Sequence, residues 1–122
     1  MDRHKETTQM LGRFQPWHEG HTALFERAIS KTGQVVILLR EQDGTDKNPF
    51  TFEQRKTQII DELKKAGYEY NISYEIINVP NITHITYGRD VGYKIEQEVF
   101  DDAIHDISAT KIREQMREEG KL

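Results

Sequence analysis

The sequence predicts a Rossmann-like fold, a three-layer α/β/α arrangement around a mostly parallel sheet of about five strands. Apolar runs typical of strands alternate with segments of helical periodicity along the chain. The run at residues 34–39 is β-branched and aliphatic almost throughout, which suits a strand covered on both faces. A loop punctuated by glycine and proline follows the first predicted strand. In such folds the crossovers are right-handed, and ligands bind beyond the carboxyl ends of the strands.

The first half of the chain predicts two strands joined by a helix. Residues 9–12 read as a short strand, and residues 13–20 form a tight loop. Apolar residues at rough helical spacing predict a helix over residues 21–31, and Gly33 stands where a C-terminal cap is expected. Residues 34–39 are the second predicted strand.

A polar loop and a capped helix are predicted next. Residues 41–49 are polar and contain Asp-Gly and Asn-Pro pairs, which favour a loop. Thr51 is followed three positions later by Gln54, the spacing of a capping box at the start of a helix. The apolar periodicity after it ends near Gly67.

The remaining part predicts two strands and a final helix. Residues 72–79 read as a third strand that ends at Pro80, and residues 82–87 as a short fourth strand. Ser108 occupies a good N-cap position for a helix that ends near Gly120.

Composition limits the classes of function. A chain of 122 residues suits one domain covering residues 1–122. The absence of cysteine excludes disulfides and thiolate metal sites. The net charge of −4 argues against broad binding to nucleic acid, which needs a basic surface. No apolar run reaches the length of a membrane span, so we expect a cytoplasmic protein without a membrane partner.

Two histidines mark a candidate anion site. His18 and His21 lie three positions apart at the start of a predicted helix, so they share one face beside unpaired backbone N–H groups. Imidazole donors there can stabilise charge that develops on a phosphoryl group. Gly12 and Gly20 allow the backbone to approach a ligand closely. The alternative interpretation is that the histidines only cap the helix at the surface.

The start of the last predicted helix is a second candidate. Ser108 and Thr110 can face a phosphate at the helix N-terminus. Arg113, within the first two turns, can clamp phosphate oxygens with its planar guanidinium. The alternative is an ordinary capped amphipathic helix whose Arg113 is solvated.

Together these segments carry a family resemblance. Residues 12–21, Gly-Arg-Phe-Gln-Pro-Trp-His-Glu-Gly-His, resemble the signature of the HIGH nucleotidyltransferase superfamily. Residues 107–113, Ile-Ser-Ala-Thr-Lys-Ile-Arg, resemble its C-terminal ISxTxxR element. Residues 48–55 resemble a segment of archaeal-type nicotinamide mononucleotide adenylyltransferases. The three matches stand in the expected order and span nearly the whole chain.

The resemblance implies a reaction class. A nucleoside monophosphate, AMP or CMP, would pass from ATP or CTP to a phosphorylated small-molecule acceptor, with release of pyrophosphate. Mg²⁺ would assist and would be held mainly by the triphosphate, without a dedicated set of metal ligands in the protein. Because the acceptor phosphate attacks the α-phosphorus in line, the protein supplies position and charge stabilisation rather than a nucleophile.

The resemblance also implies roles for individual residues. His18, His21 and Arg113 would be the catalytic groups: the histidines would stabilise the transition state, and Arg113 would grip the β- and γ-phosphates. The implied nucleotide-binding residues are Gly12, Arg13, Phe14, Gly20, Ile107, Ser108 and Thr110. The implied acceptor-binding residues are Arg13, Arg55 and Trp17. The Trp17 ring is equally well explained as a partly buried structural residue beside Pro16.

The region after Pro80 departs from the enzymes that make NAD. An additional helix, which those enzymes have before the last nucleotide-contacting loop, is missing from this sequence. Residues 87–96 resemble instead a small cytidylyltransferase-like domain that occurs with adenylylsulfate kinase. The base and the acceptor therefore stay open. So do two other interpretations: a non-catalytic nucleotide-binding or regulatory domain, and a domain of a protein assembly. Members of the family often oligomerise, so a homo-oligomer is also open.

Overall fold

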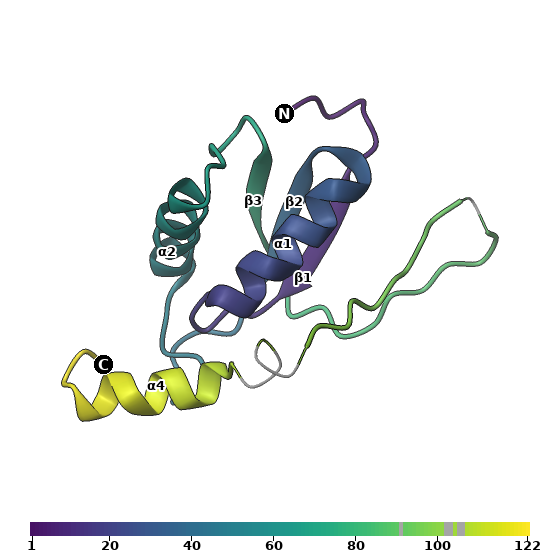
Figure 1. Cartoon of the computed structure of the whole chain (residues 1–122). Helices are drawn as coiled ribbons and strands as arrows, with labels where there is room; N and C mark the ends of the chain where they lie inside the picture. Colours follow the sequence, from purple (N-terminus) through teal and green to yellow (C-terminus); the bar gives the residue numbers. More distant parts are fainter. Residues whose placement is uncertain (91, 102–103, 105–106) are drawn as a thin grey trace.

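The computed structural model describes residues 1–90, 92–101, 104 and 107–122. Its elements are, in order, β1 (Thr8–Gly12), α1 (Glu19–Thr32), β2 (Val35–Arg40), α2 (Phe52–Lys65), β3 (Tyr74–Val79) and α4 (Ala109–Glu118) (Figure 1). The three strands form one parallel sheet in the order β1-β2-β3. The predicted Rossmann-like alternation is therefore confirmed. The expected number of strands is wrong: the described residues form three instead of about five.

Local capping signals set the ends of the helices. Gly33, with a φ of 86°, caps the end of α1 as predicted. The Thr51 hydroxyl accepts from the Gln54 amide at 3.2 Å, and the Gln54 side chain accepts from the Thr51 amide at 2.9 Å, so the predicted capping box is confirmed. Ser108 caps α4 as predicted. The start of α1, at Glu19, comes earlier than expected, because the capping residue is His18.

The core lies on one face of the sheet. Met10, Ile37 and Ile76 are register partners across the three strands, and all are buried. Phe25 from α1 joins the same core, with its ring 5.5 Å from the ring of Tyr74. Ile59 and Leu63 from α2 complete this core and are fully buried. Each such side chain contributes about 1.5–3 kcal/mol to the free energy of folding through its burial.

The opposite face of the sheet is less covered. Its central row, Leu11, Leu38 and Ile77, is only half-buried. The described part of the chain thus has two layers where three were expected. Strand order explains the difference, because two successive right-handed crossovers that step in the same direction pass over the same face.

The predicted fourth strand at residues 82–87 is also wrong. This stretch is irregular, and Ile85 and Tyr87 are 62% and 56% exposed. After β3 the chain runs out from the body as an extended loop (Figure 1). A strand needs a neighbour to pair its backbone groups, and no described segment pairs with this one. Val91, within the 87–96 resemblance, lies outside the described residues.

None of the helices in the described part of the chain is long and apolar enough to cross a bilayer.

Candidate functional site

The two segments predicted to form one site meet at one edge of the sheet. The carboxyl ends of the strands point toward α4, and α1 begins at the same edge (Figure 1). Arg113 Nη1 donates to the carbonyl of Gln15, in the loop before α1, at 2.6 Å. The side chain of Ile104 lies 3.7 Å from where a Cβ on Gly20 would stand. Segments almost a hundred residues apart in sequence are therefore neighbours here.

His18 and His21 cap α1 with their Nδ1 atoms. His18 Nδ1 accepts from the Gly20 amide, and His21 Nδ1 accepts from the His18 amide, both at 3.1 Å. The rings are stacked, with centroids 3.7 Å apart and planes inclined by 21°. A backbone N–H can only donate, so both Nδ1 atoms are unprotonated and each neutral ring carries its proton on Nε2. Both histidines therefore cap the helix, and their Nε2–H donors lie outside the cap, so a catalytic role in addition stays a prediction.

Burial keeps both imidazoles neutral. Burial, and after it the charge of His18, lower the pKa of His21 to about 3. Burial also lowers the pKa of His18, against the opposing effect of Glu19. At neutral pH the site therefore holds two neutral donors rather than imidazolium ions. A bound phosphate would shift both groups back toward protonation.

Aromatic residues fix the orientation of His21. The Phe14 ring meets it edge-on with centroids 4.8 Å apart, and the Trp17 ring lies at 5.4 Å. Trp17 is only 5% exposed, and its Nε1 donates to the Thr22 hydroxyl at 2.8 Å. Trp17 is thus a buried structural residue of the site. A contact between its ring and the acceptor substrate stays a prediction.

The two glycines make room for rings of the site. A Cβ on Gly12 would lie 2.8 Å from Phe14 Cζ, and one on Gly20 would lie 2.8 Å from His18 Cε1. Both distances are shorter than any ordinary carbon contact. Phe14 itself has a φ of 50°, in the left-handed region. Any side chain at Gly12 or Gly20 would therefore displace a ring that shapes the site.

The start of α4 supplies a buried arginine. Arg113 is 8% exposed, so the interpretation of a solvated side chain is wrong. Its Nη2 donates to the Thr110 hydroxyl at 3.3 Å, within the first turns of the helix that Ser108 caps. Ile107, just before the cap, is half-buried.

Positive charges converge around Arg113. Burial, followed by the charges of Arg13 and Arg117, lowers its pKa, and Glu114 opposes them in part. Arg13 is exposed at the end of β1. Like charges held this close repel one another, and an anion placed among them would relieve that repulsion. The charges of Arg13 and Arg117 thus favour an anion beside Arg113.

Arg55 is placed differently from a surface ligand-binding residue. It has no exposed area, and its Nη1 donates to the carbonyls of Arg13 and Arg40, both at 2.9 Å. Its Nη2 is buried and has no hydrogen-bond partner among the described residues. Arg55 therefore ties together the ends of β1 and β2, and its contact with an acceptor substrate stays a prediction.

Gln15 is a residue of this edge that the sequence interpretation missed. It is 2% exposed, and its Nε2 donates to the carbonyls of Phe50 at 2.8 Å and Gln42 at 3.1 Å. Its Oε1 accepts from the Phe50 amide at 2.8 Å. The sequence held one indication of its importance: Gln15 lies inside the first motif, residues 12–21, directly before Pro16.

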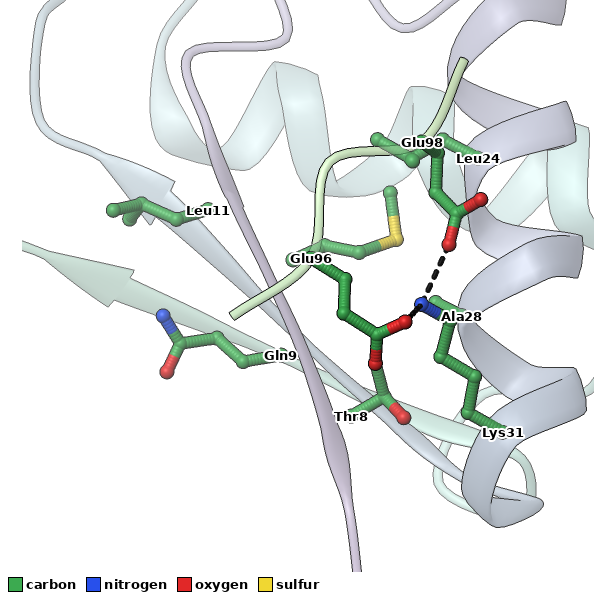
Figure 2. Close-up of a pocket in the computed structure, with 9 residues that line it drawn as sticks. Thr8, Gln9, Leu11, Leu24, Ala28, Lys31, Glu96 and Glu98 are labelled. Carbon is green, nitrogen blue, oxygen red and sulfur yellow. Dashed lines mark ion pairs between the residues drawn. The ribbon is translucent and has the colours of Figure 1, made fainter. Parts of the chain in front are cut away.

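A cavity of about 200 Å³ lies elsewhere, between β1, α1 and residues 96–98 (Figure 2). None of the predicted site residues lines it. Lys31 Nζ points between two carboxylates there, 3.1 Å from Glu96 and 2.5 Å from Glu98. Because this cation is already paired twice, the cavity is a poor place for a phosphate. Within the described part of the chain, no group of three His, Asp or Glu side chains could hold a metal ion.

The fold and the site together define a class of protein. The chain is a Rossmann-like α/β domain whose strand ends carry paired histidines and converging arginines. The family model described as cytidylyltransferase-like matches residues 10–115, from within β1 to within α4. The chain belongs to the cytidylyltransferase-like family.

Its curated relatives include archaeal proteins named nicotinamide-nucleotide adenylyltransferase. The one from Pyrococcus abyssi is 30% identical over 132 aligned positions, which cover 87% of this chain and 70% of the relative. The one from Pyrococcus horikoshii is 36% identical over 74 residues, or 59% of this chain and 39% of the relative. The one from Methanococcus aeolicus is 24% identical over 114 residues, covering 84% and 66%. The chain thus spans between 39% and 70% of the lengths of these three relatives.

Proposed function

We propose that this chain is a nucleotidyltransferase that moves AMP or CMP from a nucleoside triphosphate to a phosphorylated small molecule and releases pyrophosphate. One observation carries the proposal: the 2.6 Å bond from Arg113 to the Gln15 carbonyl, which brings the start of α4 to the loop that bears the histidines. Membership of the cytidylyltransferase-like family supports the same reaction class.

The reaction asks the protein for position and charge. An oxygen of the acceptor phosphate attacks the α-phosphorus, the bond to the bridging oxygen breaks, and pyrophosphate leaves with that electron pair. The Nε2–H donors of His18 and His21 would stabilise charge on the transferring phosphoryl group. Arg113, with Ser108 and Thr110, would hold the β- and γ-phosphates. Mg²⁺, bound by the phosphate oxygens, would neutralise part of their charge.

The other predicted residues would shape two subsites. Gly12, Phe14, Gly20 and Ile107 would line the nucleotide pocket. For the acceptor, Arg13 is exposed and would make the contact, whereas the unpaired Nη2 of Arg55 is buried and would have to be uncovered first. The buried Trp17 would act on the acceptor side through packing against His21.

The identity of the two substrates is a finer proposal. The names of the archaeal relatives favour ATP and a nicotinamide mononucleotide-like acceptor, whereas the family description favours CTP. We also propose that the protein works in the cytoplasm. Self-association is a separate question, which sedimentation velocity at several protein concentrations would answer.

A pyrophosphate-release assay tests the proposal. The protein is incubated with each of the four nucleoside triphosphates, Mg²⁺, and either nicotinamide mononucleotide or a panel of sugar and polyol phosphates. We expect pyrophosphate release that requires both a triphosphate and an acceptor. Triphosphate binding without turnover for any pair would support the second candidate, a non-catalytic nucleotide-binding domain. The irregular stretch at residues 80–90, directly after β3, is the observation that favours this second candidate.

A further inference from the structure

Gln15 lies between the two halves of the proposed site. Its main-chain carbonyl accepts from Arg113, and its side chain holds both backbone groups of Phe50. A third side-chain hydrogen bond, from Gln15 Nε2 to the carbonyl of Gln42, reaches the other end of the loop at residues 41–50. One residue with 2% exposure therefore connects the start of α4 to the loop before α2.

The loop at residues 41–50 runs between Arg40 and Thr51, whose carbonyls both accept from Arg55, a predicted acceptor-binding residue. Gln42 Oε1 and Asn48 Oδ1 are buried without a hydrogen-bond partner among the described residues, and so is Arg55 Nη2. Buried polar groups without partners are rare, because each costs free energy, and a bound ligand is one way to satisfy them. Arg117 of α4 also donates to the Asp46 carbonyl, so α4 contacts this loop directly as well as through Gln15.

We propose that Gln15 is a positioning residue that couples triphosphate binding at α4 to the conformation of the loop at residues 41–50. This inference rests on the proposed function, because it requires a triphosphate at Arg113. A guanidinium has five N–H donors, and the Gln15 carbonyl uses one of them, so Arg113 can bind phosphate without releasing Gln15. The anion removes the repulsion from Arg13 and Arg117 and steadies Arg113. Because the side-chain amide of Gln15 bonds both backbone groups of Phe50, a fixed Gln15 also restrains Phe50.

The Phe50 amide proton reports the coupling directly, because its acceptor is Gln15 Oε1. Its hydrogen exchange is followed by NMR with and without saturating tripolyphosphate, relative to the Ile37 amide at the centre of the sheet. We expect tripolyphosphate to slow the Phe50 exchange at least about fivefold in the wild type. Normalisation to Ile37 removes any general stabilisation of the fold.

Two variants separate coupling from packing. Gln15→Met keeps the length of the side chain but removes its hydrogen bonds, so the Phe50 exchange should no longer respond to tripolyphosphate. Gln97→Met makes the same chemical change at an exposed position and should respond as the wild type does. A residual response of wild-type size in Gln15→Met would overturn the role of the side chain.

Binding of tripolyphosphate is measured by calorimetry on the same samples. Binding to the wild type with no change at Phe50 would overturn the coupling and leave the proposed function intact. No binding to the wild type would overturn the triphosphate site and the coupling with it. Even if Gln15→Met fails to fold, the wild-type measurement alone shows whether tripolyphosphate binding changes the exchange of the Phe50 amide.

Discussion

The two histidines of the site use their ring nitrogens for separate tasks. Each Nδ1 accepts a backbone amide at the start of α1, and each neutral ring therefore presents Nε2–H away from the cap. We propose that the same side chains combine this structural role with a chemical one. The stacking of the rings at 3.7 Å also means that protonation of one disfavours protonation of the other.

Removal of the His21 imidazole should lower turnover more than it weakens triphosphate binding. We expect His21→Ala to lower kcat by about 10²-fold or more, with a modest loss of triphosphate affinity, since its donor is used mainly in the transition state. Steady-state pyrophosphate release, beside equilibrium binding, measures both. The control is His84→Ala, at an exposed position in the loop after β3. An unchanged kcat in His21→Ala would contradict the catalytic role.

Acid should destabilise the protein through the same residue. The pKa of His21 is about 3 in the folded state and 6.5 as its ordinary value, so between these limits the unfolded chain binds more protons. The free energy of unfolding must then fall as pH is lowered from about 6.5 toward 3. Urea titrations between pH 6.5 and 5, where carboxylates stay mostly ionised, should show a shallower slope for His21→Gln than for the wild type. Equal slopes would show that His21 is not held neutral.

At the scale of elements, the sequence predicted the features that depend only on residues close together in the chain. The capping box at Thr51, the cap at Ser108 and the apolar run of β2 were all visible in the sequence, because each depends on neighbours within a few residues. The strand expected at residues 82–87 failed for the opposite reason, since its existence depends on a pairing partner far along the chain.

The candidate site follows the same division. Motif spacing pointed to His18, His21 and Arg113, and the structure brings their segments together. The burial of Arg55 and the side-chain bonds of Gln15 were not predictable, because these side chains join segments that lie 15 to 42 residues away in the chain. No local pattern marks a glutamine that will meet the backbone of a distant loop.

Loss of the N-terminal cap on α2 should lower the free energy of unfolding. Thr51→Ala leaves the Gln54 amide without its side-chain acceptor, and we expect the free energy of unfolding to fall by about 1 kcal/mol. Urea denaturation measures it. Thr57→Ala, an exposed threonine inside the same helix, is the matched control and should be neutral or slightly stabilising. If both variants lost equal stability, the cap would not be the cause.

Considered as a whole molecule, the domain has a hydrophobic body and a helix attached to it by polar contacts. Arg113 is the one buried residue in α4, and it reaches the body through the Gln15 carbonyl. Arg117 adds a bond to the Asp46 carbonyl. Among the described residues, α4 thus depends on charged hydrogen bonds where α1 and α2 depend on apolar burial. An anion between α4 and the histidines would add a further contact at this junction.

Ligand binding should therefore stabilise the entire fold through α4. At a concentration one hundred times Kd, a ligand that binds only the folded state adds about 2.7 kcal/mol, enough to raise Tm by several degrees. We expect such a shift with ATP or CTP in the wild type, measured by calorimetric melting, and its loss in Arg113→Ala because triphosphate affinity falls. Arg27→Ala removes a half-exposed arginine paired with Glu98, outside the site, and should keep the full shift. If Arg113→Ala kept both the shift and the affinity, the triphosphate would have to be held elsewhere. The meeting of α4 with the histidine loop would then be a packing contact only.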